Sequence, residues 1–212
     1  LADWIDRVFG PRKYYLISLV IVLYALLPFF MAFEGRKPEV RELVVLATMI
    51  ALATAGRAAF FMTPSFKPII AIVIISAIAF GAEAGFLVGS MTMLVSNFLF
   101  GQGPWTPWQM FAMGFIGFLS GILYRLRILP TKRLQLSVYG FLVTFMIYGG
   151  IMNPAALFMS VYQFSWSGLL AIYISGVPVD LVHASSTFLF LWIGAKPLLE
   201  KLQRIKVKYG LL

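Results

Sequence analysis

The residues whose types could hold a ligand gather in one short stretch, residues 96–110, "SNFLFGQGPWTPWQM". It combines neutral hydrogen-bonding side chains with flat aromatic ones: Asn97, Gln102, Trp105, Thr106, Trp108 and Gln109. The glycines and prolines between them predict a tight, non-helical path. A lining of neutral amides and aromatic rings suits a large organic ligand with rings and amides better than an inorganic ion. The alternative is a belt of interfacial tryptophans, which leaves the amides unexplained.

Side chains of the same kinds recur further along the chain, at Tyr162, Gln163 and Trp166. We expect them to form a second wall of the same pocket, because a ligand site needs apolar surface with a few convergent polar groups.

Two ionisable side chains are further candidates for ligand contact. Arg57 lies about two helical turns before Pro64. An arginine at that depth either faces the protein interior, where it can meet an acidic group of a ligand, or snorkels to the outer surface. His183 could pair with Asp180 at the mouth of the pocket, but no neighbouring His or carboxylate gives the spacing of a metal site.

Several chemistries are excluded by residues that the sequence lacks. Cysteine is absent, so no disulfide, thiolate nucleophile or Cys-ligated metal is possible. There is no G-x-x-x-x-G-K-[ST] loop and no H-E-x-x-H motif. Of the eight acidic residues, only Glu83 and Asp180 lie near apolar segments, which gives no proton relay for an ion-coupled carrier. We therefore expect no catalytic residue, metal or cofactor.

The elements that position these residues are membrane helices. Hydrophobic residues make up 61% of the 212-residue chain, the mean hydropathy is +0.91, and the apolar runs approach the roughly 20 residues that cross a bilayer. A β-barrel would need alternating strands instead of continuous apolar runs. The sequence thus predicts an all-α polytopic membrane protein of one domain, with seven spans near 14–33, 41–63, 68–80, 84–100, 108–125, 134–152 and 184–199.

Residues 153–183 are apolar but contain Pro154, Pro178, Gly168 and Gly176, which predicts a long folded loop with one helical piece.

Lys and Arg residues predict the orientation. The segments 125–133 and 196–208 are rich in both and should be cytoplasmic, whereas 101–107 and 153–183 contain neither and should face outward. The formal charge of +9 therefore marks topology and not a nucleic-acid partner. Seven spans place the N-terminus outside, which conflicts with the basic residues in "DRVFGPRK".

Small residues recur every four positions in two parts of the chain. Ala47, Ala51 and Ala55 lie along one side of the second predicted span. Such a stripe lets another helix approach closely, either inside this protein or as the docking face for a separate membrane subunit. The pairs 85/89 and 117/121 are glycines with the same spacing, and we expect internal contacts there.

An alanine stripe followed by "FKPIIAIVIISAIAFGAEAGFLVGSMTMLVSNFLFGQGPWTPWQMFAMGFIGFLSGIL" resembles the substrate-binding S components of energy-coupling factor (ECF) vitamin transporters. The resemblance covers roughly residues 41–200. It implies a six-helix core over 41–212, to which residues 1–40 add one extra N-terminal helix. It also implies that outer loops close over a vitamin, and that Ala47 and Ala51 dock a transmembrane coupling protein that carries two ATPases.

The "GQGPWTPWQM" stretch is most similar to cobalamin-type members, and a corrinoid ringed by neutral amides suits the candidate pocket. Folate, biotin and pantothenate carry carboxylates and would need Arg57. The resemblance thus implies a vitamin-binding subunit, not an enzyme, in the plasma membrane of a prokaryotic cell with a cytoplasmic C-terminus. The competing hypothesis is an autonomous small carrier.

Overall fold

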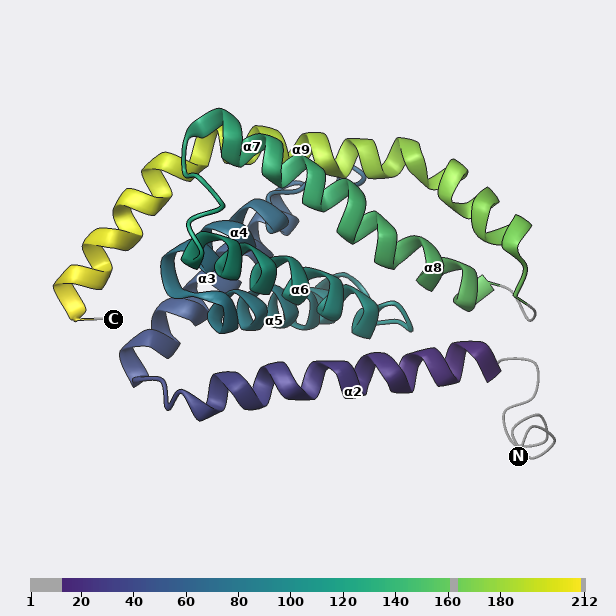
Figure 1. Cartoon of the computed structure of the whole chain (residues 1–212), viewed down its shortest axis with the longest axis horizontal. Coiled ribbons are helices and arrows are strands. Elements are labelled where there is room, and N and C mark those ends of the chain that lie inside the picture. The colour runs from purple at the N-terminus through teal and green to yellow at the C-terminus, as the bar shows by residue number, and fades with distance from the viewer. Residues whose placement is uncertain (1–12, 161–163, 211–212) are drawn as a thin grey trace.

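The computed structural model describes residues 13–160 and 164–210, and these form helices joined by short turns (Figure 1). In chain order they are α2 (Lys13–Gly35), α3 (Val40–Ala59), α4 (Ile69–Phe80), α5 (Ala82–Phe100), α6 (Thr106–Arg125), α7 (Arg133–Val143), the π-helix η2 (Thr144–Tyr148), α8 (Gly149–Ser160) and α9 (Trp166–Tyr209). Because α7, η2 and α8 follow without a break, six helical rods follow α2. The predicted all-α membrane fold, with a six-helix core and one extra N-terminal helix, is confirmed.

Helix α4 forms the centre of the fold, and all 12 of its residues are buried. At 1.5 Å per residue it is only about 18 Å long, well short of the roughly 30 Å hydrocarbon core of a bilayer. It contacts α3, α5, α6 and α9. A helix of Ile, Val and Ala that is apolar on every side is stable only inside such a bundle.

Helices α5 and α6 lie against each other through their glycines. A Cβ atom added to Gly85 would lie 2.5 Å from the Cβ of Ala77 on α4 and 2.8 Å from the carbonyl oxygen of Gly117 on α6. Gly89 faces the backbone of Met113 in the same way. The predicted internal contacts of the glycine pairs are therefore confirmed.

The prediction of a long loop over 153–183 is wrong. Helix α8 continues to Ser160, and α9 begins at Trp166 and runs for 44 residues with Pro178 inside it. The side chain of Ser165 caps the start of α9 by accepting a hydrogen bond from the backbone N–H of Gly168. Gly176 provides room for Asn153, since an added Cβ would crowd that side chain. In a membrane protein, neighbouring helices accommodate such prolines and glycines, so they do not mark a loop.

Five helical segments of the described chain are long and apolar enough to cross a membrane: α3, α5, α6, residues 133–160 and α9. The apolar part of α2, Leu19–Gly35, and α4 are shorter. Helix α2 packs on α5 and α6, where the ring of Phe29 stacks on Phe86 at 4.1 Å between centroids.

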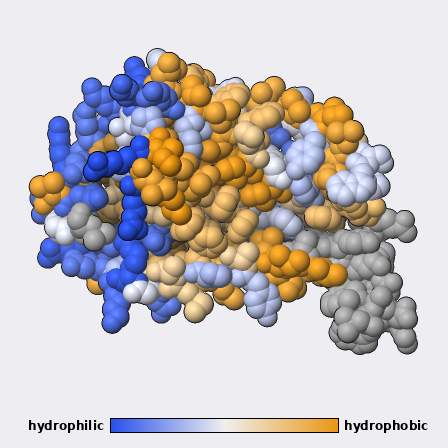
Figure 2. All heavy atoms as spheres, in the orientation of Figure 1, coloured by the Kyte–Doolittle hydropathy of each residue, from blue (hydrophilic) through white to orange (hydrophobic). Residues whose placement is uncertain are grey.

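Hydrophilic residues gather at one end of the molecule, over the α2–α3 turn, the start of α7 and the end of α9 (Figure 2). Polar contacts link the α2–α3 turn to α3 and α5, and the end of α9 to α4. Arg36 forms ion pairs with Glu42 at 2.7 Å and Glu83 at 3.5 Å, and the Lys206 ammonium donates to the carbonyl oxygen of Ala79 at 2.6 Å. We call this the basic end. The ends of α3, α5 and α8 and the starts of α6 and α9 lie at the opposite end (Figure 1).

Candidate functional site

A hydrogen-bond network at the end opposite the basic end is centred on Asn97 of α5, whose side chain is fully buried. Its amide oxygen accepts from the Arg57 guanidinium at 2.6 Å. Its amide nitrogen donates to the Thr106 hydroxyl at 2.9 Å and to the Gln109 side-chain oxygen at 2.8 Å. A buried amide needs such partners, because an unpaired polar group inside a protein is costly.

The loop between α5 and α6 extends this network. The Thr106 hydroxyl donates to the side-chain oxygen of Gln102 at 2.9 Å and accepts from the backbone N–H of Gly103 at 3.3 Å. The Gln102 amide donates in turn to the carbonyl oxygen of Leu94 at 3.2 Å. The hydrogen bonds of Asn97 and Thr106 therefore stabilise this loop. They also hold the side chains of Arg57, Gln102 and Gln109 in place.

Arg57 faces the interior and does not snorkel. Besides Asn97, its guanidinium donates to the hydroxyl of Ser96 at 2.6 Å. It also lies over the ring of Phe100, 5.3 Å from the centroid. The arginine thus ties the end of α3 to the end of α5, where its charge is stabilised by two oxygen acceptors and an aromatic face.

A cavity of about 140 Å³ lies beside this network. Arg57 and Gln109 contribute to its wall, and His183 of α9 lies opposite with its ring 4.9 Å from that of Tyr148 in edge-to-face geometry. The full lining combines polar, aromatic and apolar side chains: Arg57, Ser65, Lys67, Ile69, Met93, Gln109, Met113, Tyr148 and His183.

The turn between α3 and α4 closes one side of the cavity. The Lys67 ammonium donates to the carbonyl oxygen of Thr63 at 2.9 Å, and the hydroxyl of Ser186 on α9 donates to the carbonyl oxygen of Lys67 at 2.9 Å. Burial, and to a smaller extent the nearby charge of Arg57, lower the pKa of Lys67 below its ordinary value. Arg57 and Lys67 both line this small cavity. Two cationic donors favour ligands with carbonyl or other electron-rich oxygens.

The predicted tryptophans do not line this cavity. Trp105 is 40% exposed and Trp166 is 78% exposed. Trp108 is buried on another side of α6, against Val22 and Ala155, and its ring is near that of Phe158. Asp180 does not pair with His183 but accepts from Asn153 at 2.8 Å. Tyr162 and Gln163 lie outside the described residues.

Sequence reasoning missed three polar or aromatic residues of the cavity wall, Ser65, Lys67 and Tyr148, and its apolar residues, such as Met113. Ser65 and Lys67 lie in the short "TPSFK" turn. The closeness of this turn to Arg57 in the sequence could have indicated that it contributes to the cavity. Tyr148 comes from the π-helix and Met113 from α6, and no local pattern marks either residue.

The alanine stripe of α3 lies on the surface of the chain. Leu46, Met49 and Ala53 of this helix are buried in the core. Ala47, Ala51 and Ala55 are exposed on the other side. The stripe is therefore not used for packing within the described chain.

The groups that line the cavity can bind a small molecule by hydrogen bonds and aromatic contacts. Within residues 13–160 and 164–210, no group of three or more His, Cys, Asp or Glu side chains could hold a metal ion. The cavity offers hydrogen-bonding groups, two cations and aromatic edges at one end of a helical membrane bundle. These features define a membrane protein with a small polar binding cavity.

Comparison with protein families identifies the class more closely. The family model described as "ECF-type riboflavin transporter, S component" matches residues 37–204, well over half of the chain. The chain therefore belongs to this family of S components, which are substrate-binding subunits of transporters and not enzymes. The match excludes α2 and gives no support to the predicted cobalamin-type resemblance. Searches of curated proteins and of solved structures gave no significant match.

Proposed function

We propose that this S component binds riboflavin at the end of the bundle opposite the basic end and delivers it across the membrane. The observation that carries the proposal is the cavity between Arg57, Lys67, Gln109, Tyr148 and His183, in a chain of the riboflavin-transporter family.

The chemistry of the lining suits a flavin. The isoalloxazine ring is flat and uncharged, with carbonyl oxygens and ring nitrogens along one edge and a polyhydroxylated ribityl chain. Cationic and amide donors from Arg57, Lys67 and Gln109 can meet the carbonyl oxygens, while the rings of Tyr148 and His183 offer apolar contact.

The size of the cavity also favours a flavin over cobalamin. Its volume of about 140 Å³ lies below the roughly 300–1,000 Å³ typical of pockets for drug-sized ligands. A three-ring flavin is itself larger than this volume, so the surrounding turns have to open to admit it. A corrinoid is several times larger and would require separation of the helices themselves.

Delivery requires an energy source that this chain does not itself contain. We propose that the exposed side of α3 with Ala47, Ala51 and Ala55 docks a transmembrane coupling protein, which joins two ATPase subunits. Small residues allow the close backbone approach that stabilises helix pairs in lipid. An autonomous carrier would transport riboflavin in vesicles without these partners, whereas the proposed subunit would only bind it.

The basic end is proposed to be cytoplasmic, together with the C-terminus. With this orientation the cavity opens toward the outside, where the vitamin is captured. An impermeant thiol reagent should label Pro104→Cys in intact cells, and Thr131→Cys only after permeabilisation. The reverse labelling pattern would contradict this orientation.

Equilibrium binding to the purified full chain tests the ligand. We expect quenching of riboflavin fluorescence on binding and no heat of binding with cobalamin. Tyr148→Phe and His183→Gln should each weaken riboflavin binding about tenfold, because the first removes a hydroxyl group and the second an aromatic imidazole ring from the cavity wall. Tyr139→Phe is the matched control, since its hydroxyl bonds to Ser120 at 2.8 Å and does not line the cavity. Binding of cobalamin but not riboflavin would contradict riboflavin as the ligand. Equal effects of all three variants would contradict this cavity as the binding site.

A further inference from the structure

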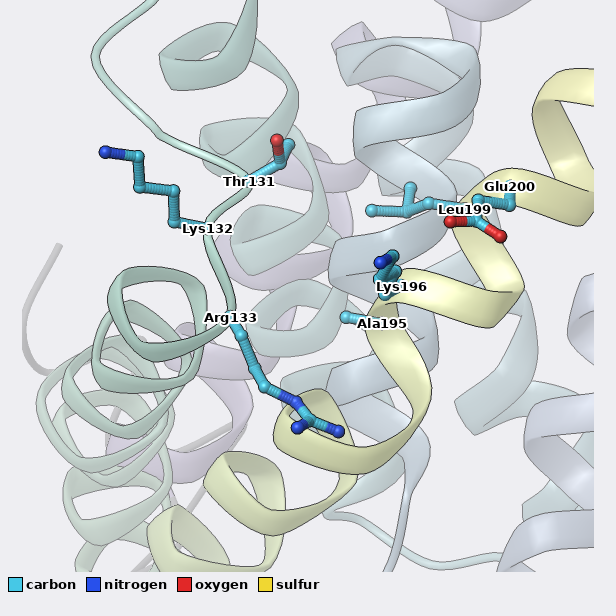
Figure 3. Close-up of a pocket in the computed structure, with 7 residues that line it drawn as sticks. All are labelled: Thr131, Lys132, Arg133, Ala195, Lys196, Leu199 and Glu200. Atoms are coloured by element: carbon cyan, nitrogen blue, oxygen red, sulfur yellow. The ribbon is translucent and has the colours of Figure 1, made fainter.

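A second cavity lies at the basic end, between the start of α7 and the C-terminal part of α9 (Figure 3). Its volume is about 700 Å³. The lining contains three cationic side chains and one carboxylate: Thr131, Lys132, Arg133, Ala195, Lys196, Leu199 and Glu200. The vitamin site does not use this cavity, because the two lie at opposite ends of the bundle.

An apolar groove lies on the surface between the same two helices, further from the basic end. It has a volume of about 430 Å³ and is lined by Val138, Phe141, Ser185, Phe188 and Leu189. On α9, residues 185, 189, 196 and 200 are separated by four, seven and four positions, so they share one side of the helix. The groove and the basic cavity therefore follow each other along one side of α9.

Trp192 connects the two spaces. The Arg133 guanidinium lies 5.0 Å from the centroid of its ring and donates to its carbonyl oxygen. The ring also stacks on Phe188, 5.8 Å away, which lines the apolar groove. An aromatic residue between a cationic and an apolar space is typical of the boundary between lipid headgroups and acyl chains.

We propose that an anionic glycerophospholipid occupies these two spaces, with its phosphate between Arg133 and Lys196 and one acyl chain along the groove. Figure 3 shows Arg133 reaching from α7 toward α9, while Lys132 points away from α9. Lys132 is nevertheless one of the residues that line the cavity, so its charge adds to the positive potential there. Basic pockets between membrane helices on the cytoplasmic side suit acidic headgroups.

The carboxylate of Glu200 limits which headgroup fits. Three cations and one carboxylate leave a net charge of +2 on the lining, which favours a phosphodiester. Glu200 can accept a hydrogen bond from a headgroup hydroxyl, as in phosphatidylglycerol. The choline group of phosphatidylcholine carries no such hydroxyl donor, so we expect weaker binding of that lipid.

Native mass spectrometry of the delipidated full chain, titrated with individual lipids, tests the proposal. We expect phosphatidylglycerol to bind at least tenfold more tightly than phosphatidylcholine or phosphatidylethanolamine. The double variant Lys132→Gln and Lys196→Gln should lose this preference. The matched control, Lys201→Gln with Lys208→Gln, removes the same charge from the same end outside the cavity and should retain affinity within twofold.

Two further measurements separate a lipid from other ligands. Ser185→Trp fills the exposed groove and should weaken phosphatidylglycerol binding without changing the melting temperature or riboflavin binding. Free glycerol phosphate should not compete at millimolar concentration, since it lacks an acyl chain. Equal binding of the three lipids, equal losses in both double variants, or full competition by glycerol phosphate would each overturn the proposal.

Discussion

Two sets of small residues with the same spacing have opposite surroundings in this protein. Gly85 and Gly89 of α5 meet Gly117 and Met113 of α6, so closely that an added Cβ would collide with backbone atoms. The alanines of α3 have the same four-residue spacing and lie on the exposed side of their helix.

The difference shows what the spacing alone encodes. Small residues four positions apart allow two helices to approach, but they do not specify which helix is the partner. For α5 the partner is α6, the next helix in the chain. For α3 the core is contacted by large residues such as Leu46 and Met49, and the side with the small residues is exposed.

The largest effect is expected at the internal contact. Gly117→Ala would place a methyl group against the carbonyl of Gly85, and the helices would have to separate. Overpacking of this kind typically costs about 1–3 kcal/mol. The matched control is Gly194→Ala, where an added Cβ meets no atom within 4 Å. Thermal unfolding, monitored by size-exclusion chromatography, should show a clearly lower melting temperature for Gly117→Ala and an unchanged one for Gly194→Ala. Equal melting temperatures would mean that α5 and α6 do not depend on close backbone contact.

The next effect concerns the exposed stripe. We expect Ala51→Leu to fold and to bind riboflavin as the wild type does, because the side chain points away from both core and cavity. Uptake with the complete transporter should fall to background, since a branched side chain separates two closely packed helices. Ala171→Leu, at an exposed alanine of α9, is the matched control and should transport normally. Loss of binding in isolated Ala51→Leu would instead indicate internal packing.

Much of the polar network could be predicted from the sequence, because its members lie close together along the chain. Asn97, Gln102, Thr106 and Gln109 fall within 13 residues and do form one hydrogen-bonded group. Trp108 lies in the same stretch, but its position on α6 directs it toward α2 and α8. Proximity in sequence identifies the group, whereas the helical rotation that decides which side chains face the cavity depends on packing.

The remaining errors have a physical cause in the membrane environment. Pro154 and Pro178 would break helices in a soluble protein, and the loop prediction followed from that rule. Here both lie inside helices. Tyr148 and His183 meet across the cavity although they are 35 positions apart, and only the packing of α9 on η2 brings them together.

An effect on both stability and affinity is expected at Asn97, where α5 and α6 are joined by hydrogen bonds instead of glycines. Asn97→Ala leaves the Arg57 guanidinium and the Gln109 amide without their shared partner, which typically costs about 1–3 kcal/mol of stability. Riboflavin affinity should also fall, about tenfold, because both partners line the cavity. The control is Gln102→Ala, since Gln102 is exposed and does not line the cavity. Equal losses of affinity in the two variants would show that the network does not support the site through Asn97.

The smallest effect is expected at Ala55, and it measures how far the proposed docking contact extends. Ala51 and Ala55 are about 6 Å apart along α3, and their directions differ by about 40°. Two straight helices that cross approach most closely at one point and diverge on either side of it. If that point lies near Ala47 and Ala51, Ala55→Leu should reduce uptake only a few-fold while riboflavin binding is unchanged. Uptake by Ala55→Leu and Ala51→Leu should therefore be compared at equal expression in the complete transporter. A complete loss for Ala55→Leu with normal uptake for Ala51→Leu would move the point of closest approach toward Arg57 and the vitamin site.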